Sequence, residues 1–233
     1  IYYFVMVFIL KISNVKIHKT NQSLMPLYKT ITFNPTTKLL IWKIEEPFDV
    51  LSKNIQLTTH CQARVDSMKS DLHRRGFMSI RHLLAYVGYT DFDLSYDQNG
   101  KPHLADGTYI SISHSYIFSA IIISDYPVGI DIEKQRPKIL KIAHKFTTLQ
   151  EYSPLASQEA MMRKLTIVWG TKEAVYKSFA HPGISFLEHI SVEDFRLEDP
   201  STFAKIHIAN RSETYDVYFQ EFEGFTLVYA IVV

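Results

Sequence analysis

The chain has 233 residues, of which 46% are hydrophobic, so it can build one large packed domain or two smaller lobes. Its 25 Lys and Arg residues are balanced by 24 Asp and Glu residues, which argues against a general nucleic-acid binder. A single cysteine, Cys61, excludes an intrachain disulfide and a cysteine-based zinc cage, and it favours a reducing, cytoplasmic setting.

An apolar run occupies residues 1–10. The run is too short to span a bilayer, no basic segment precedes it, and no small-residue cleavage site follows it. We therefore expect no membrane anchor, no secretion signal and no membrane partner. An additional strand is the alternative interpretation of this segment.

The next part of the chain is predicted to contain two strands followed by helices. Alternating apolar residues from Lys29 to Glu45 predict the strand pair, which ends at Glu46-Pro47. Apolar residues at near-helical spacing predict a helical segment from Thr59 to Val87. We expect Gly76 to divide this segment into two helices and Gly88 to close the second.

Three strands are predicted after these helices. Alternation predicts one at Tyr109–Ser113, and a largely apolar run predicts a second at Tyr116–Ser124. A turn at residues 125–127 then leads into a third at Val128–Glu133. This order places Ser113-His114-Ser115 at a bend close to the third strand.

The remainder is predicted to hold a long helix and an antiparallel tail. The helix runs from Ser157 to Phe179 and ends at Pro182-Gly183, and Thr148–Glu151 has the form of a capping box before it. Alternation predicts tail strands at Ala204–Ile208, Tyr215–Phe222 and Phe225–Val233, with a turn at Glu223-Gly224. Strands, helices and strands thus occur twice, the second time from about Tyr126, which indicates a duplicated α+β architecture.

Two acids in the predicted strand Val128–Glu133 are candidates for a metal site. Asp131 and Glu133 share one face of the strand, while Ile130 and Ile132 share the other. Neighbouring carboxylates repel each other unless a cation lies between them. If the long helix brings Glu173 close, the three acids form an open, oxygen-rich site that suits Mg²⁺ and its bridging to phosphates.

Lys177 lies one helical turn beyond Glu173, on the same face of the helix. A hard metal together with a lysine suits the handling of a phosphate ester or a pyrophosphate. The plainer interpretations are a solvated strand end for Asp131 and Glu133, and a helix-stabilising i,i+4 pair for Glu173 and Lys177. Spacing alone leaves both interpretations open.

The two motifs together resemble a known family. Gly129-Ile130-Asp131-Ile132-Glu133, followed by Trp169-x-x-Lys172-Glu173-Ala174-x-x-Lys177, is similar to the paired signature of the surfactin-synthetase-activating 4′-phosphopantetheinyl transferases. Gly100-Lys101-Pro102 and Ser113-His114-Ser115 stand ahead of it in that family's order, so the resemblance covers most of the chain. Gly170 departs from the family's usual Ser, Thr or Cys, and a glycine inside a helix costs roughly 1 kcal/mol.

The resemblance implies an α+β fold of two similar lobes related by a pseudo-twofold axis. Coenzyme A would lie in the cleft between the lobes, and the protein would be a monomer. The lobes would span residues 25–125 and 126–233, the second carrying the metal site. Residues 1–24 would be an N-terminal extension without function, since Met25-Pro26-Leu27-Tyr28 resembles the start of family members.

The implied reaction moves 4′-phosphopantetheine from coenzyme A to a serine of an apo acyl or peptidyl carrier protein, with Mg²⁺, and releases adenosine 3′,5′-bisphosphate. Asp131, Glu133 and Glu173 would hold the Mg²⁺. Glu173, directly or through a water on the metal, would accept the serine proton. Lys177 would stabilise the departing phosphate. Which carrier protein is modified is not readable from the sequence.

The resemblance also implies contacts to coenzyme A. Lys101 and Pro102 match positions near the adenine and its ribose phosphate, and His114 matches a phosphate-binding position. Lys172, beside Glu173, is a further candidate. An arginine should meet the 3′-phosphate, because its guanidinium matches phosphate oxygens, and Arg81 suits this position better than Arg74 or Arg75.

Each of these residues has a plainer interpretation, as a turn, a histidine satisfied by the backbone or a solvated surface charge. Glu151 is expected to cap its helix and is left out of the catalytic set. Two other functions remain open. One is a metal-dependent pyrophosphate hydrolase acting on coenzyme A-like substrates. The other is an inactive module that binds coenzyme A or a carrier.

Overall fold

The computed structural model describes residues 27–148 and 157–233. The predictions for residues 1–24, and those that involve Glu151, lie outside the described residues. The mixture of helices and sheets confirms the predicted α+β class. No helix in the described part of the chain is long and apolar enough to cross a bilayer.

The first half of the described chain comprises β1 Lys29–Thr32, β2 Lys38–Lys43, α1 Phe48–Leu51, α2 Thr59–Ser67, α3 Asp71–Tyr86, β3 Leu94–Tyr96, β4 Pro102–Leu104, β5 Tyr109–Ser115 and β6 Phe118–Ser124. The second half comprises β7 Val128–Lys134, α4 Lys138–Ile142, a 3₁₀ turn η1 Ala143–Lys145, α5 Gln158–Phe179, α6 Phe186–His189, β8 Ile190–Val192, β9 Ser201–Ile208, β10 Arg211–Phe222 and β11 Phe225–Val232.

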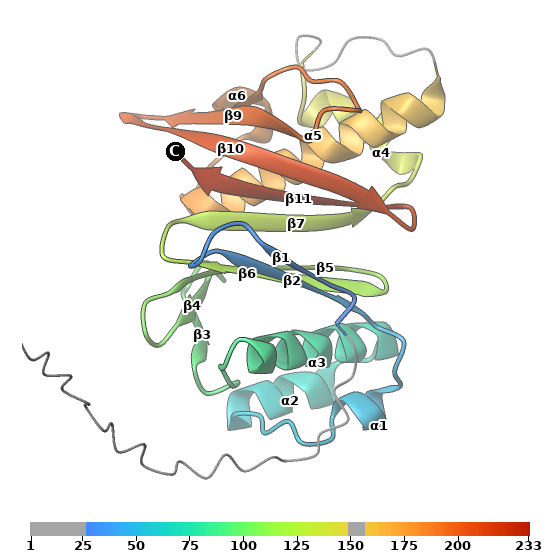
Figure 1. Cartoon of the computed structure of the whole chain (residues 1–233), viewed down its shortest axis with the longest axis vertical. Coiled ribbons are helices and arrows are strands. Elements are labelled where there is room, and N and C mark those ends of the chain that lie inside the picture. Colours follow the sequence, from blue (N-terminus) through green and yellow to red (C-terminus); the bar gives the residue numbers. More distant parts are fainter. Residues whose placement is uncertain (1–26, 149–156) are drawn as a thin grey trace, which may run out of the picture.

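These elements form four layers: helices, sheet, sheet and helices (Figure 1). One sheet has the strand order β1-β2-β6-β5 and the other has the order β7-β11-β10-β9-β8. The helices α1, α2 and α3 lie against the first sheet, and α4, α5 and α6 lie on the far side of the second (Figure 1). Strands β5 and β7 are therefore both edge strands, and they meet where the two sheets adjoin.

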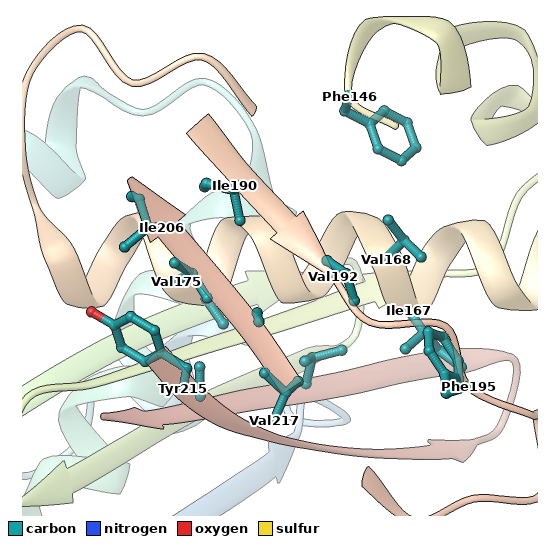
Figure 2. Packing of buried hydrophobic residues seen from close by; sticks show 14 of the residues in the cluster. Phe146, Ile167, Val168, Val175, Ile190, Val192, Phe195, Ile206, Tyr215 and Val217 are labelled. Atoms are coloured by element: carbon teal, nitrogen blue, oxygen red, sulfur yellow. The ribbon is translucent and has the colours of Figure 1, made fainter. Parts of the chain in front are cut away.

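Three apolar clusters hold the layers together. One cluster packs the helices α1, α2 and α3 against the first sheet, around Trp42 and Leu83. A second lies between α5 and the second sheet, where Val175, Ile206 and Tyr215 pack together (Figure 2). The third joins the inner faces of the two sheets and comprises Leu39, Ile41, Phe118, Ala120, Ile122, Val128, Ile130, Ile132, Phe225, Leu227, Tyr229 and Ile231. The two halves therefore share a core.

Several predicted elements are confirmed. Strands β1 and β2 form the expected pair, and β9, β10 and β11 form the expected antiparallel tail. Helix α5 begins after Ser157, whose hydroxyl accepts a hydrogen bond from the Ala160 amide. Glu223 and Gly224 have φ of 48° and 74°, the left-handed values that a tight hairpin turn requires.

The position of the break between α2 and α3 was wrongly predicted. The break falls at residues 68–70, and Gly76 lies inside α3. A β-carbon at Gly76 would lie 3.3 Å from the ring of His114, so the glycine permits close packing instead of ending a helix. Gly88, with φ of 89°, does follow the end of α3 as predicted.

The predicted bend at Ser113-His114-Ser115 is also wrong. All three residues belong to β5, and the chain turns at Tyr116, which has φ of 52°. Helix α5 ends at Phe179 as predicted, and Ala180 adopts the left-handed conformation ahead of Pro182. The β3–β4 hairpin was not predicted. The chain passes from the first sheet to the second between β6 and β7, and the division into domains at residue 125 stays a prediction.

Two glycines allow α5 to lie directly on the second sheet. A β-carbon at Gly129 in β7 would lie 1.8 Å from the carbonyl oxygen of Ala174 in α5. A β-carbon at Gly170 in α5 would lie 2.7 Å from a methyl group of Val228 in β11 and 3.7 Å from Asp131 Oδ2. Gly170, the departure from the family pattern, is therefore required by close packing.

We predict that Gly129→Ala destabilises the fold by about 1–3 kcal/mol, because the new methyl group would overlap backbone that cannot rotate away. Gly170→Ala should cost less, because the Val228 side chain can adjust and alanine favours helix by about 1 kcal/mol. Urea unfolding midpoints measure both. Lys205→Ala, on the exposed face of β9, is the control. A Gly129→Ala protein as stable as the control would contradict this packing.

Candidate active site

Strand β7 carries Asp131 and Glu133 on the face opposite the shared core. Ile130 and Ile132 point into that core, as the alternation predicted. Asp131 is buried, with 4% of its surface exposed, and Glu133 is partly exposed. Asp131 Oδ1 accepts a hydrogen bond of 2.9 Å from Ser113, and Glu133 Oε2 accepts one of 3.3 Å from Ser115. Both carboxylates are therefore held by the neighbouring strand β5.

Lys177 forms an ion pair with one of these acids, Asp131. Its ammonium lies 2.7 Å from Asp131 Oδ1 and donates to the Ile130 carbonyl at 3.0 Å and the Ser113 hydroxyl at 3.3 Å. The lysine thus reaches from α5 across to β7. Asp131 Oδ2 is buried and has no hydrogen-bond partner. A buried carboxylate oxygen without a donor is costly, so this atom is poised to accept a ligand.

Glu173 lies on α5, one turn before Lys177. Burial, together with the negative charges of Asp131 and Glu133, raises its pKa to about 7, although the charge of Lys177 opposes the shift. Burial and Asp131 likewise raise the pKa of Glu133. The three predicted acids are therefore electrostatic neighbours. Within residues 27–148 and 157–233, however, no three His, Cys, Asp or Glu side chains form a ready-made metal cage.

A cleft of about 390 Å³ opens beside these acids. Lys101 and Pro102 line it from the first half of the chain, and Tyr176, Lys177 and His181 line it from the second. The Lys101 ammonium donates to the Ser178 carbonyl at 3.0 Å, and burial lowers its pKa. The structure therefore brings the predicted residues Lys101, Pro102 and Lys177 to one cleft.

His114 follows Ser113 on β5. The residue is exposed overall, but its ring packs against α3 at Gly76 and lies 6.5 Å from the ring of His73. Partial burial of the ring, and then the charges of His73 and Lys177, lower its pKa. A neutral imidazole can still donate one hydrogen bond to a phosphate oxygen.

Arg81 is not brought to the site. It is 3% exposed, and its guanidinium pairs with the buried carboxylate of Asp91 at 2.8 Å. The same guanidinium lies 3.4 Å from the centre of the Phe77 ring. The sequence showed an arginine on the correct helix but not the partner that encloses it. The structure therefore gives Arg81 a structural role and leaves it no free face for a phosphate.

Lys172 is not brought to the site either. It is fully buried, and its ammonium donates to the carbonyls of Phe186 at 2.9 Å and Ile190 at 2.7 Å. These carbonyls belong to α6 and the start of β8. Adjacent residues of a helix point about 100° apart, so the neighbour of Glu173 faces a different side. Lys172 therefore fastens the α6–β8 segment to α5.

The serines of β5 are functional candidates that sequence reasoning did not select. Ser111, Ser113 and Ser115 recur at every second residue, which is the strand period. Each accepts a hydrogen bond from a backbone amide of β7. The alternation was visible in the sequence. It became informative only once β5 was found beside β7.

One family of known proteins matches the part of the chain that carries these residues. The sequence model of the 4′-phosphopantetheinyl transferase superfamily matches residues 127–231, which include β7, α5 and the tail strands. Asp131, Glu133, Glu173 and Lys177 all lie inside the match. The second half of the chain is therefore similar to the 4′-phosphopantetheinyl transferase superfamily.

Three curated members of the superfamily are similar to this chain. The 4′-phosphopantetheinyl transferase gsp of Aneurinibacillus migulanus is 29% identical over 150 residues, 62% of this chain and 61% of the relative. The transferase Sfp of Bacillus subtilis is 30% identical over 118 residues, 47% of this chain and 53% of the relative. A further 4′-phosphopantetheinyl transferase of Bacillus subtilis is 33% identical over 141 residues, which are 56% of this chain and 61% of the relative. The chain thus matches little more than half the length of these relatives.

We predict that Lys172→Met destabilises the protein, because the carbonyls of Phe186 and Ile190 lose a buried donor. An unsatisfied buried acceptor costs about 1–3 kcal/mol. Thermal and urea unfolding measure the loss. Lys205→Met, at an exposed strand position, provides the control for the change of side chain. Equal stability of the two variants would show that the buried ammonium contributes nothing.

The raised pKa of Glu173 predicts a pH dependence in chelator-treated protein. The pKa of about 7 means that the folded chain holds this proton up to about pH 7, whereas an ordinary glutamic acid has a pKa of 4.5. The stabilisation is therefore complete below about pH 4.5 and is lost as the pH rises towards 7. Glu173→Gln should flatten the decline in unfolding free energy across this range, and Glu159→Gln, exposed in the first turn of α5, should not. A decline that persists in Glu173→Gln would refute the assignment.

Proposed function

We propose that the chain transfers the 4′-phosphopantetheine arm of coenzyme A to a serine of an apo acyl or peptidyl carrier protein, with Mg²⁺, releasing adenosine 3′,5′-bisphosphate. The superfamily and its similar transferases support the class of reaction. The observation that carries the proposal for this chain is Asp131. It is buried, held by Ser113 and Lys177 through one oxygen, and left with its other oxygen unpartnered beside two more acids.

The donor set of this site suits a magnesium ion. Hard divalent cations prefer carboxylate oxygens, and Asp131 Oδ2 is a buried acceptor without a donor. Burial, and then the negative charge of Asp131, raises the pKa of both Glu173 and Glu133, and a cation would offset this charge. We propose that Asp131, Glu133 and Glu173 hold the ion. When bound, it would neutralise the pyrophosphate and withdraw electrons from the phosphorus under attack.

The cleft lined by Lys101, Pro102 and Lys177 is the proposed place for coenzyme A. Its volume of about 390 Å³ lies in the usual range of small-molecule sites. Lys101 and Lys177 supply positive charge to its walls, as a phosphate-rich ligand requires. His114 lies beside Ser113 and would donate to a phosphate oxygen. We assign no such contact to Arg81 or Lys172.

In the proposed reaction the serine oxygen attacks the phosphorus, and the bond to the departing adenosine phosphate breaks. Glu173 accepts the serine proton, and its pKa of about 7 suits a group that takes up a proton at neutral pH. The Lys177 ammonium, already fixed by Asp131 and the Ile130 carbonyl, stabilises charge on the leaving phosphate. Because these groups are pre-positioned, they need little rearrangement.

The carrier protein is proposed to approach the acids at Glu133, outside the cleft proposed for coenzyme A. A separate cavity of about 120 Å³ is lined by Glu133, Lys134, Arg136, Lys138, Ile142 and Trp169. Among the described residues, none lines both this cavity and the cleft that holds Lys101. Basic side chains with an apolar floor suit a protein surface that presents acidic and apolar groups around its serine.

The decisive experiment is mass spectrometry of several apo carrier proteins incubated with the chain, coenzyme A and Mg²⁺. We predict a mass gain of one phosphopantetheine, which is lost when Mg²⁺ is chelated. Asp131→Asn should reduce the rate by at least about 100-fold, since it removes a charge that the ion requires. Asp125→Asn, in the exposed turn before β7, should keep the wild-type rate.

The same assay separates the alternatives. Cleavage of coenzyme A without any carrier would favour a pyrophosphate hydrolase. Binding of coenzyme A without turnover in Mg²⁺ would favour an inactive binding module. Full activity in Asp131→Asn would remove the proposed metal site.

A further inference from the structure

Strands β5 and β7 are joined by side chains. Ser111, Ser113 and Ser115 of β5 accept hydrogen bonds from β7 backbone amides at 3.1, 3.1 and 3.3 Å. The donors are Ile130, Ile132 and Lys134, so the contacts advance in steps of two on both strands. We call Ser111, Ser113 and Ser115 the serine ladder. It satisfies the amides of one edge strand with the hydroxyls of another.

Each hydroxyl of the serine ladder still has a proton to donate after accepting an amide. Ser113 donates to Asp131 Oδ1, and Ser115 donates to Glu133 Oε2. By the same register, Ser111 faces Gly129, which has no side chain to receive a proton. The ladder therefore contains two serines that hold a carboxylate and one that does not.

The geometry at Asp131 indicates what this arrangement achieves. Ser113 and Lys177 both bind Oδ1, which leaves Oδ2 buried and unpartnered. One oxygen is fixed and the other is offered to the site. At Glu133, Ser115 likewise binds one oxygen, Oε2. A carboxylate with a fixed rotamer loses less conformational entropy when it binds a cation.

We propose that Ser113 and Ser115 are positioning residues for the divalent cation: each holds one carboxylate oxygen so that the other faces the ion. This inference rests on the proposed function, because it assumes that Asp131 and Glu133 bind a metal. The serines themselves do not touch the reacting atoms in this assignment. They act through the two acids, as outer hydrogen-bond partners do in metal sites.

The test is a titration of Mn²⁺ into the whole protein without coenzyme A, with free Mn²⁺ measured by electron paramagnetic resonance. Mn²⁺ uses the same carboxylate ligands as Mg²⁺. Ser115→Ala and Ser113→Ala should weaken Mn²⁺ binding about 10-fold or more, the usual effect of losing such a partner. Ser111→Ala should leave the affinity as in the wild type. Ser115→Thr, which keeps the hydroxyl, should restore it.

Stability provides the internal control. All three alanine variants deprive a β7 amide of its acceptor, so each should lose a similar amount of stability in urea unfolding. A purely structural ladder would make Ser111→Ala and Ser115→Ala equal in Mn²⁺ affinity as well, and that result would overturn the inference. If the wild-type protein modifies carriers and all three serine variants bind Mn²⁺ as tightly as it does, the positioning inference is wrong and the proposed transferase function still holds. Wild-type protein that binds no Mn²⁺ would reject both the metal site and the positioning.

Discussion

The contact between β7 and α5 at Gly129 and Ala174 is the constraint on which the rest of the site depends. With no β-carbon at Gly129, the helix lies against the strand at backbone distance. Asp131, two residues further along the same face, is thereby enclosed beneath α5, and Glu173 and Lys177 are carried to it. The glycine at position 170 opens the same space from the helix side. The site is a consequence of how closely two elements can approach.

That closeness concentrates negative charge. Glu173 would titrate near pH 4.5 in isolation, and burial beside two other acids raises its pKa to about 7. A single ammonium, that of Lys177, offsets part of this charge through Asp131. The fold thus tolerates a group of acids that would repel each other, and a positive ligand would relieve them. Repulsion of this kind is typical of sites built for a cation rather than for stability.

Sequence periodicity was sufficient for the elements that carry the site. The alternation around Asp131 and the helical spacing from Ser157 to Phe179 gave the correct strand and helix, because burial on one face leaves a regular pattern. The burial of Arg81 and Lys172 was not predicted, since their partners, Asp91 and the carbonyls of Phe186 and Ile190, lie outside the helix that carries each residue. A pattern along one strand or helix cannot report which tertiary partner satisfies a charged group. For the same reason the serines of β5 were seen as neighbours of a histidine and not as a bridge to β7.

The shared core between the two sheets has a consequence for how such a protein can be divided. A fragment that begins near residue 127, where the superfamily match starts, would expose Ile130, Ile132, Leu227 and Tyr229, a continuous apolar surface now covered by the other sheet. Such a half would need a substitute cover, most simply another copy of itself. The first half of the chain therefore covers the apolar inner face of the second sheet, in addition to any part it has in ligand recognition.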